Sequence, residues 1–496
     1  MLYLGIDSGT QSTKCIVLDL ENGDILTSAS ASYELIDGLP PGHLEQHPAD
    51  WISALDTAVQ GCLVKIGDRK AEVRGIGVSG QQHGLVVLDA KDQVVRPAKL
   101  WCDTSTVDQC AQFDAAFGGK SGLIELAGNA MLPGYTAPKI LWLKQNEPQH
   151  FAAVRSVLLP HDYLNFYLTG EKTMEYGDAS GTGLLNLKTR EWCTPLIDFI
   201  DPALREWLPP VTSSSKPAGK LRSGLADAWE LEGEVIVSAG GGDNMMGAIG
   251  TGNTKPGVVT ASFGTSGTLY CYAENPVIDP QGEIAAFCDS TGAWMPLVCT
   301  MNVTVATEQV RELFGWTIEQ LQSAVDATAA GSNGVLFLPY LNGERTPNLP
   351  SGTGVFHGLT TANMLPGPMA RAVIEGATLG LAYGLKRFRD LGITAKEIRL
   401  TGGGSRSAVW RQLAADVFGA ETVCLSSSEG AALGAAVQAA WAHAGGSVTL
   451  ESLSNRLVKL DESTRCFPDP SRTTLYADLL EKHTSLTRAL HEKGWL

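Results

Sequence analysis

Apolar runs of strand length alternate with amphipathic stretches along most of the chain, which is the pattern of an α/β protein. Near the start, Leu2 to Ile6 forms a short apolar run that predicts a buried strand. Apolar residues between Trp51 and Leu63 recur at helical spacing, and a second apolar run, Val73 to Val78, follows them. The spacing changes from a period of about 3.6 to a continuous strand-like run, so it predicts a helix followed by a strand.

The C-terminal half repeats this alternation. The pattern predicts two helices, from Arg371 to Arg387 and from Ser407 to Phe418, and two strands, from Ile398 to Thr401 and from Thr422 to Leu425. A further apolar helix runs toward Ala442, and the spacing of Ser426 and Glu429 predicts a capping box at its start.

Two glycine and hydroxyl turns, each between two apolar runs, lie in different halves of the chain. The first is Asp7-Ser8-Gly9-Thr10 and the second is Phe263-Gly264-Thr265-Ser266-Gly267-Thr268. Glycine permits close backbone approach, which allows successive N–H groups to converge on a phosphate. Either turn alone is typical of an ordinary β-hairpin. Together with a later glycine loop, Gly402-Gly403-Gly404-Ser405, they predict an ATP clamp built from two half-molecules.

Length and composition indicate two domains. At 496 residues the chain exceeds what one core usually supports. A segment rich in Gly, Asn, Thr and Pro at 249–257 predicts a boundary there. We therefore expect an N-terminal domain at 1–250, a C-terminal domain at 251–445, and a helical extension at 446–496 that packs on the second domain.

The charge balance excludes some classes of partner. A net charge of −16 argues against a general affinity for nucleic acid or for anionic membranes. No apolar run reaches the roughly 20 residues of a membrane span, and the N-terminus enters a strand instead of a signal peptide, which predicts a cytoplasmic protein. Ten cysteines without a C-x-x-C pair are typical of reduced thiols.

Three further motifs resemble dinucleotide, phosphate and metal sites, but the secondary structure expected around each does not fit such a site. The glycines of Gly75 to Gly80 match a dinucleotide fingerprint, yet a strand and not a helix is expected next. Gly119-Lys120-Ser121 resembles the end of a Walker loop with no strand before it. His43, Glu45 and His47 resemble metal ligands, but the flanking prolines favour a loop over a ligand helix.

A strand that ends in Gly240-Gly241-Gly242-Asp243-Asn244 completes a family pattern. This segment, the two hairpins, the loop at 402–405 and Gly343-Glu344-Arg345-Thr346-Pro347 together resemble the FGGY carbohydrate kinases. A family signature across Gly134, Thr136, Lys139, Ile140, Trp142, Leu143 and Asn146 adds to the resemblance, which extends from about Tyr3 to about Ala440. It implies an actin-like ATPase fold, in which two ribonuclease-H-like domains with mixed five-stranded sheets close over an interdomain cleft.

The resemblance implies ATP-dependent phosphorylation of a ketopentose, with D-xylulose as the expected sugar. Asp243 would be the general base and Asp7 would hold Mg²⁺. The expected nucleotide contacts are Gly9, Thr10, Lys14, Gly264, Thr265, Gly402, Gly403 and Gly404. The expected sugar contacts are Gln82, His83, Trp101, Asp103, Asp243 and Asn244.

Two alternatives stay open. One is another sugar kinase of the same family, such as a ribulokinase. The other is an actin-like or chaperone-like ATPase switch, which uses a similar clamp without phosphorylating a metabolite. The expected partners are a small sugar and ATP, with a homodimer as a possible assembly and no nucleic acid or membrane.

Overall fold

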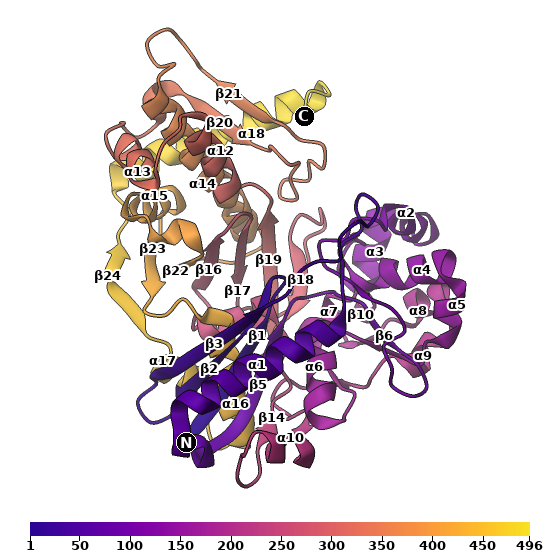
Figure 1. The fold of residues 1–496 in the computed structure, drawn as a ribbon. Helices are drawn as coiled ribbons and strands as arrows, with labels where there is room; N and C mark the ends of the chain where they lie inside the picture. Colours follow the sequence, from indigo (N-terminus) through magenta and orange to yellow (C-terminus); the bar gives the residue numbers. More distant parts are fainter.

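Two mixed β-sheets of seven strands each organise the molecule, which a computed structural model describes over residues 1–496 (Figure 1). The first sheet has the strand order β13 (Gly219–Lys220), β14 (Ile236–Val237), β5 (Val73–Gly80), β1 (Leu2–Ser8), β2 (Ser12–Asp19) and β3 (Ile25–Ser32), and β15 (Gly241–Gly242) also pairs with β5. The second has the order β18 (Ala285–Cys288), β19 (Trp294–Thr300), β17 (Gly267–Cys271), β16 (Val258–Phe263), β22 (Glu397–Thr401), β23 (Glu421–Leu425) and β24 (Leu460–Cys466).

Each sheet contains the same central arrangement, which confirms the predicted duplication. In the first, β1 pairs antiparallel with β2 and parallel with β5. In the second, β16 pairs antiparallel with β17 and parallel with β22. The expected strand number of five is wrong, because further strands join both sheets: β13 and β15 join the first, and β18 and β24 join the second. At the sheet edges, β13, β18 and β24 pair with strands whose N–H and C=O groups would otherwise be exposed.

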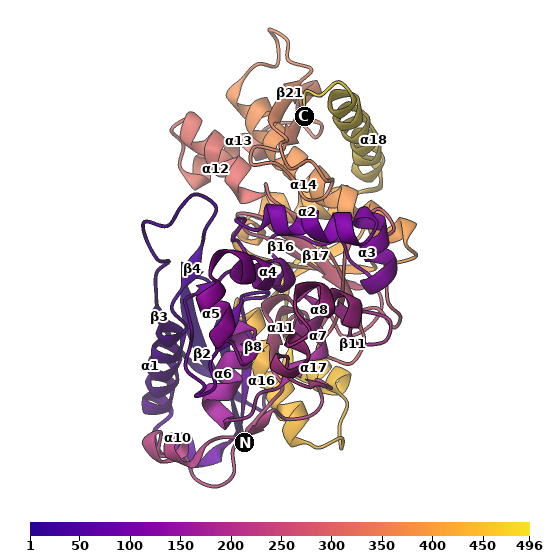
Figure 2. The same cartoon turned by 90° about the vertical axis from the view of Figure 1, so that its right-hand side faces the viewer.

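Helices cover both sheets, and a separate group of helices lies beside the first sheet (Figure 2). The helices on the first sheet are α1 (Pro48–Ile66), α6 (Pro160–Thr169), α11 (Asp243–Gly250) and α16 (Gly430–His443). Those of the second half are α12 (Thr304–Leu313), α13 (Ile318–Asp326), α14 (Pro366–Asp390), α15 (Ala408–Phe418) and α18 (Pro470–Glu492). The separate group contains α2 (Val107–Ala116), α3 (Gly119–Ala127), α4 (Thr136–Asn146), α5 (Pro148–Ala153) and α8 (Thr194–Ile200).

The helix α16 lies directly on the first sheet, although it comes from the C-terminal half of the chain. A Cβ atom at Gly5 of β1 would lie 1.9 Å from the Ala432 carbonyl oxygen, and one at Gly77 of β5 would lie 2.0 Å from that of Ala435. Glycine is needed at both positions because helix backbone occupies the space of a side chain. The division of the chain at 250 and 445 stays a prediction.

The C-terminal segment contributes to the second half. The strand β24 pairs with β23, and α18 packs against α14 and α15. The predicted capping box is wrong: α16 begins at Gly430 without a side-chain cap. The carboxylate of Glu429 turns instead to Lys14, whose Nζ lies 2.8 Å away, because a charged partner is available there.

No helix combines the length and the apolar character that a membrane span requires. All ten cysteines are free, as predicted. A cytoplasmic location and a homodimer stay predictions.

Candidate active site

Two carboxylates, those of Asp7 and Asp243, lie beside the C-terminal end of the central strand β5. In the sheet register, Ser79 of β5 lies opposite Asp7 of β1 on one side and opposite Gly241 of β15 on the other. Asp7 Oδ1 accepts a hydrogen bond of 2.8 Å from Ser79 Oγ. Asp243, the first residue of α11, follows β15 directly. The parallel pairing of β1, β5 and β15 therefore brings Asp7 and Asp243 to the same edge of the sheet.

The glycine turn before Asp243 is tightly enclosed. A Cβ atom would lie 2.9 Å from His161 Cδ2 at Gly240, 2.5 Å from Ser290 Oγ at Gly241, and 2.6 Å from Gln82 Cγ at Gly242. Side chains from three separate segments fill the space on this turn, so only glycine fits at each position. This packing holds the start of α11, and with it Asp243, in one place.

Burial and neighbouring charge change the acidity of Asp243. Burial, reinforced by the negative charges of Asp7 and Asp178, raises the pKa of Asp243 to about 7. Its Oδ1 accepts hydrogen bonds from the N–H and the Nδ2 of Asn244, at 2.7 and 3.0 Å. A carboxylate with a pKa near neutrality is suited to take a proton from a hydroxyl group.

Gln82 and Asn244, two expected sugar contacts, lie together beside Asp243. Asn244 Nδ2 donates a hydrogen bond of 2.8 Å to Gln82 Oε1. The Asn244 Nδ2 therefore lies between the Gln82 side-chain carbonyl and the Asp243 carboxylate, whereas Gln82 Nε2 lies 3.2 Å from Met245 Sδ. The structure thus brings the expected base together with the turn at 81–84, here called the sugar turn, which carries the expected sugar contacts Gln82 and His83.

His83 adopts an unusual backbone conformation in the same turn. Its φ is +62°, which is uncommon for a residue with a side chain and often marks a functional site. The His83 carbonyl oxygen accepts hydrogen bonds from Lys139 Nζ at 2.9 Å and Thr136 Oγ1 at 3.1 Å, which hold it there. The imidazole lies 5.0 Å from the Tyr135 ring and 5.8 Å from the Phe287 ring, between centroids.

The His83 imidazole is neutral. Burial, with the positive charges of Lys139 and Arg345, lowers the pKa of His83 to about 3. A neutral imidazole has one donor and one acceptor nitrogen, which suits hydrogen bonding to a hydroxyl group.

The first hairpin turn is held by side chains. Gly9 N donates to Ser12 O at 3.0 Å and closes the turn. Thr10 is bonded three times: its Oγ1 accepts from Trp101 Nε1 at 3.0 Å and lies 3.4 Å from Gln81 Oε1, and its carbonyl accepts from Gln46 Nε2 at 2.7 Å. Trp101, expected on the sugar side, therefore links that side to the first phosphate turn.

The second hairpin turn is held by backbone. The carbonyl oxygens of Gly264 and Thr265 accept from the N–H groups of Thr304 and Val303, at 3.0 and 3.1 Å. The N–H groups of Gly264 and Thr265 themselves donate no backbone hydrogen bond. Free N–H groups in a tight turn are suited to bind phosphate oxygens.

The glycine loop after β22 packs against this second turn. Gly402 has a φ of +83°, and a Cβ atom there would lie 2.7 Å from the Phe263 carbonyl. A Cβ atom at Gly404 would lie 3.0 Å from the Phe263 side chain, whereas Gly403 faces open space. The structure brings the 402–404 loop and the second turn together, as the nucleotide hypothesis requires.

Lys14 lies in register with Asp7, on the strand that leaves the first turn. Its Nζ forms an ion pair with Glu429, in the segment that leads into α16. The expected contact of Lys14 with phosphate stays a prediction.

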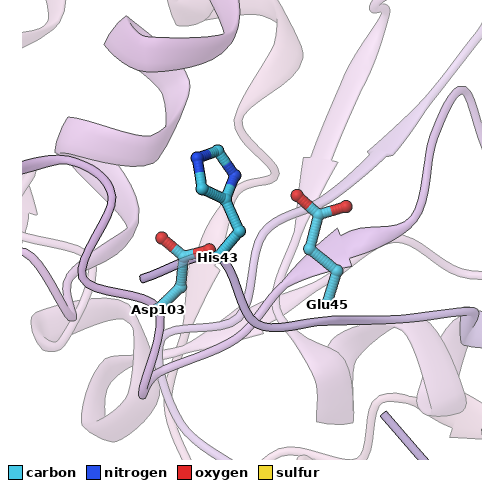
Figure 3. A group of neighbouring side chains, drawn as sticks. All are labelled: His43, Glu45 and Asp103. Carbon is cyan, nitrogen blue, oxygen red and sulfur yellow. The ribbon is translucent and has the colours of Figure 1, made fainter. Parts of the chain in front are cut away.

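Asp103 belongs to a buried cluster that resembles a metal site (Figure 3). Ligand atoms of His43, Glu45 and Asp103 lie within 4.8 Å of one another. The Lys99 ammonium fills the space between them: Nζ lies 3.0 Å from Asp103, 3.3 Å from Glu45 and 3.2 Å from His43 Nδ1. A lysine thus provides the positive charge that a metal ion would bring.

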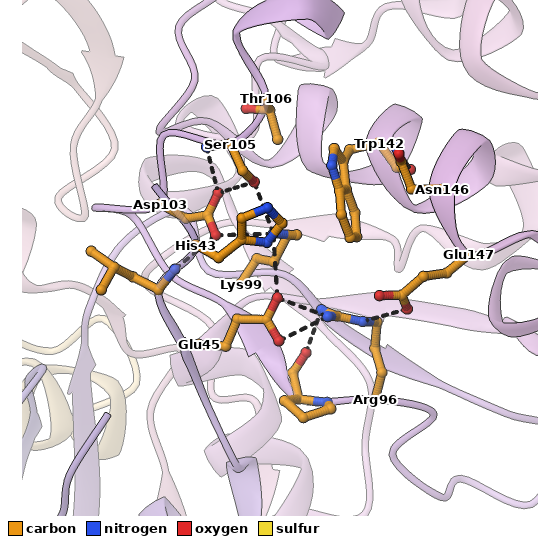
Figure 4. A network of polar contacts seen from close by, with 12 residues as sticks. His43, Glu45, Arg96, Lys99, Asp103, Ser105, Thr106, Trp142, Asn146 and Glu147 are labelled. Atoms are coloured by element: carbon orange, nitrogen blue, oxygen red, sulfur yellow. Dashed lines mark hydrogen bonds and ion pairs between the residues drawn. The ribbon is translucent and has the colours of Figure 1, made fainter. Parts of the chain in front are cut away.

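Further contacts complete this cluster (Figure 4). The Lys99 ammonium lies 4.0 Å from the centroid of the Trp142 ring, and Arg96 forms an ion pair of 2.8 Å with Glu45. Asp103 also accepts hydrogen bonds from Leu44 N and Ser105 Oγ. With its carboxylate used in this way, a role of Asp103 in sugar binding stays a prediction.

Sequence reasoning missed several residues of this site. Ser79 holds Asp7, and Tyr135 and Phe287 pack on His83. Tyr135 lies inside the signature segment at 134–146, which was a usable signal. Phe287 comes from the opposite half of the molecule, so no local pattern pointed to it.

Comparison with known proteins agrees with this geometry. The model of the FGGY family of carbohydrate kinases, N-terminal domain, matches residues 2–250, and that of the C-terminal domain matches residues 259–443. The chain belongs to the FGGY family of carbohydrate kinases. It is 43% identical to the xylulose kinase of Haemophilus influenzae over 488 residues, which cover 97% of this chain and 98% of that protein.

Solved structures show the same fold. A xyloylose kinase from Brucella ovis superposes with a TM-score of 0.93 at 32% identity, covering 99% of this chain and all of that one. A gluconate kinase from Lactobacillus acidophilus superposes with a TM-score of 0.92 at 26% identity, covering 99% and 98% of the two chains. The expected class of fold, two α/β domains of a carbohydrate kinase, is confirmed.

Proposed function

We propose that this kinase transfers the γ-phosphoryl group of ATP to a ketopentose, converting D-xylulose to D-xylulose 5-phosphate. The observation that carries the proposal is the placement of Asp243 beside Gln82 and Asn244, at the strand ends that also hold Asp7. The similarity to xylulose kinases over nearly the whole chain supports the choice of sugar.

In this reaction the C5 hydroxyl oxygen of the sugar attacks the γ-phosphorus of ATP. A bond forms between that oxygen and phosphorus, the bond from phosphorus to the bridging oxygen of ADP breaks, and the hydroxyl proton passes to the carboxylate of Asp243. Phosphoryl transfer depends mainly on positioning and on compensation of charge. The enclosed glycine turn at 240–242 supplies the positioning of the base.

The nucleotide would lie between the two hairpin turns. The free N–H groups of Gly264 and Thr265 would bind phosphate oxygens, and the 402–404 loop would lie against the nucleoside. The residues fit Mg²⁺: Asp7 Oδ1 takes one hydrogen bond from Ser79, Oδ2 has no donor, and magnesium is commonly held by one or two carboxylates together with phosphates. Bound Mg²⁺ would neutralise phosphate charge.

Sugar recognition would come from Gln82, His83 and Asn244, with Tyr135 and Phe287 closing the pocket around the imidazole. Because Phe287 belongs to the second sheet and packs on His83, both halves contribute to the pocket, and their closure over bound sugar would exclude water. Exclusion of water favours transfer to sugar over hydrolysis.

A sugar panel tests the proposal. ADP production with Mg-ATP is measured for D-xylulose, D-ribulose, a hexulose, a polyol and gluconate. We expect the highest kcat/KM with D-xylulose. A higher value for D-ribulose would identify a ribulokinase, a higher value for gluconate would place the enzyme with the gluconate kinases, and ATP turnover that does not depend on sugar would favour the ATPase switch.

A further inference from the structure

The loop Gly343-Glu344-Arg345-Thr346, here called the Arg345 loop, is fastened to the end of strand β19. Glu344 Oε1 accepts hydrogen bonds from Met301 N at 2.6 Å and from Arg345 N at 2.8 Å. Glu344 Oε2 lies 3.2 Å from Asn302 Nδ2, and the Gly343 carbonyl accepts from the same nitrogen at 2.7 Å. A buried carboxylate thus fixes the backbone on which Arg345 stands.

The segment that holds the Arg345 loop also holds the second hairpin turn, at Gly264 and Thr265. Met301 and Asn302 continue directly into Val303 and Thr304, whose N–H groups donate to the carbonyls of Thr265 and Gly264. The Arg345 loop and the turn expected to bind the γ-phosphate are therefore held by one short segment, 301–304.

The other side of the Arg345 loop is attached close to the sugar turn. Thr346 Oγ1 donates a hydrogen bond of 2.8 Å to the Glu283 carbonyl, just before β18. Phe287 of β18 packs on His83 at 5.8 Å between ring centroids. In Figure 1, β18 lies where the two halves of the molecule meet. Arg345 therefore lies in a loop that is hydrogen-bonded on one side to the 301–304 segment, which holds the second phosphate turn, and on the other side to the segment just before β18, the strand that packs on the sugar turn.

The Arg345 side chain is exposed and positively charged at this position. Its Nη1 lies 4.0 Å from Sγ of Cys299, the second-to-last residue of strand β19. Its charge reaches the sugar pocket: it helps burial and Lys139 to lower the pKa of His83, and it opposes the burial that raises the pKa of Tyr135. ATP brings negative charge to the pocket beside His83, so an unpaired cation is well placed there.

We propose that Arg345 is a further catalytic residue, which binds the phosphoryl group as it passes from the nucleotide to the sugar and holds it on the sugar phosphate product. A guanidinium group presents two parallel N–H donors to phosphate oxygens, a geometry that lysine lacks. Cations at the transferred group stabilise the transition state of phosphoryl transfer. The inference rests on the proposed function, because it needs a phosphoryl acceptor in the His83 pocket.

Three variants test this role. Arg345→Ala removes the positive charge, and Arg345→Lys keeps the charge but lacks the two parallel N–H donors. Arg389→Ala is the matched control, because Arg389 is an exposed arginine at the end of α14. We expect kcat to fall about 100-fold in Arg345→Ala and about 10-fold in Arg345→Lys, with KM for the sugar within threefold of the parent. Arg389→Ala should retain the parent kcat.

Calorimetric binding without ATP provides the second readout. We expect Arg345→Ala to bind D-xylulose 5-phosphate at least tenfold more weakly than the parent and to bind D-xylulose equally well. A kcat within threefold of the parent, or an unchanged affinity for the sugar phosphate, would overturn the role of Arg345. If the sugar panel selects another substrate, the proposed function fails, and the same comparison with that sugar and its phosphate still tests Arg345.

Discussion

The two halves of the molecule share one strand arrangement but contribute different chemistry. The first hairpin turn is surrounded by side chains, with Thr10 bonded to Trp101 and Gln46 and with Asp7 bonded to Ser79. The second turn is fastened by backbone hydrogen bonds and leaves its N–H groups free. One strand arrangement thus carries two kinds of turn: side chains and two carboxylates surround the first, and the second leaves backbone N–H groups free. This difference fits the proposal that the first half binds the sugar and the second half binds the phosphates.

One buried histidine in each half has the opposite pKa shift from the other. In the first, His161 lies 2.7 Å from Asp178 and 3.0 Å from Asp162, and these carboxylates outweigh burial and raise the pKa of His161 to about 9. In the second, His483 is buried without a charged partner, and burial lowers its pKa to about 4. His161 is therefore held in the charged form by its paired carboxylates, whereas His483 is neutral because no charged group faces it.

The largest expected effect is on catalysis by the first half. Asp243→Asn keeps the shape of the side chain but removes the base, so kcat should fall by about 10²- to 10⁴-fold. The matched change in the second half, Asp416→Asn, alters a buried acid of α15 that bonds to Gln412 and Asp469 N. Steady-state assays should show kcat of Asp416→Asn within twofold of the parent. Equal decreases in kcat in both variants would contradict the proposal that the base comes from the first half.

The second effect is on stability, through the packing of α16 against the first sheet. Gly5→Ala places a methyl group on the Ala432 carbonyl, so the free energy of unfolding should fall by about 3 kcal/mol. Gly224→Ala, where a Cβ atom meets nothing within 4 Å, is the control and should change it by less than about 0.5 kcal/mol. Urea denaturation measures both. A stable Gly5→Ala variant would show that α16 does not lie on the sheet as described.

The third effect is a pH dependence that separates the two buried histidines. His483 stays neutral in the fold down to about pH 4 but takes a proton in the unfolded chain below about pH 6.5, so its contribution to stability is lost as the pH falls through this window. Between pH 7 and 5 the free energy of unfolding of the parent should fall by about 2 kcal/mol more than that of His483→Gln. His491→Gln, an exposed site on the same helix, should follow the parent.

For His161 the sign is opposite. Its raised pKa gives a stabilisation that is complete below about pH 6.5 and is lost as the pH rises through about 9. The unfolding free energy of His161→Gln should therefore approach that of the parent as the pH is raised from 6.5 to 9.5. Convergence at low pH instead would contradict the paired state of His161.

The smallest effect is on the nucleotide side. Gly402→Ala strains a residue with a φ of +83° and presses on the Phe263 carbonyl at the second turn, so KM for ATP should rise about tenfold, which corresponds to about 1.4 kcal/mol. KM for the sugar should stay within twofold. Gly403→Ala, which faces open space in the same loop, serves as the control. If KM for the sugar rises instead, the 402–404 loop belongs to the sugar side.

Much of the fold could be predicted because its signals are local. The hairpins at Gly9 and Gly264 and the helix from Ser407 to Phe418 appear in the structure as the alternation of apolar residues and the turn glycines indicated. The position of Asp243 directly after a short strand and a glycine turn is likewise a short-range pattern, and its role as the base stays a prediction. Periodicity and turn chemistry act over a few residues, so one sequence is enough to read them.

The sequence by itself determined the duplicated strand and turn units, the acidic charge balance and the positions of Asp7 and Asp243 at the ends of strand and glycine-turn segments. Only the tertiary structure decided that α16 covers the first sheet, that Lys99 fills the apparent metal site of Asp103, that Glu429 pairs with Lys14 instead of capping its helix, and that Arg345 stands beside the pocket of His83. The physical reason is that ion pairs and close packing depend on distance in space, and these partners lie far apart along the chain or are chosen among several nearby charges.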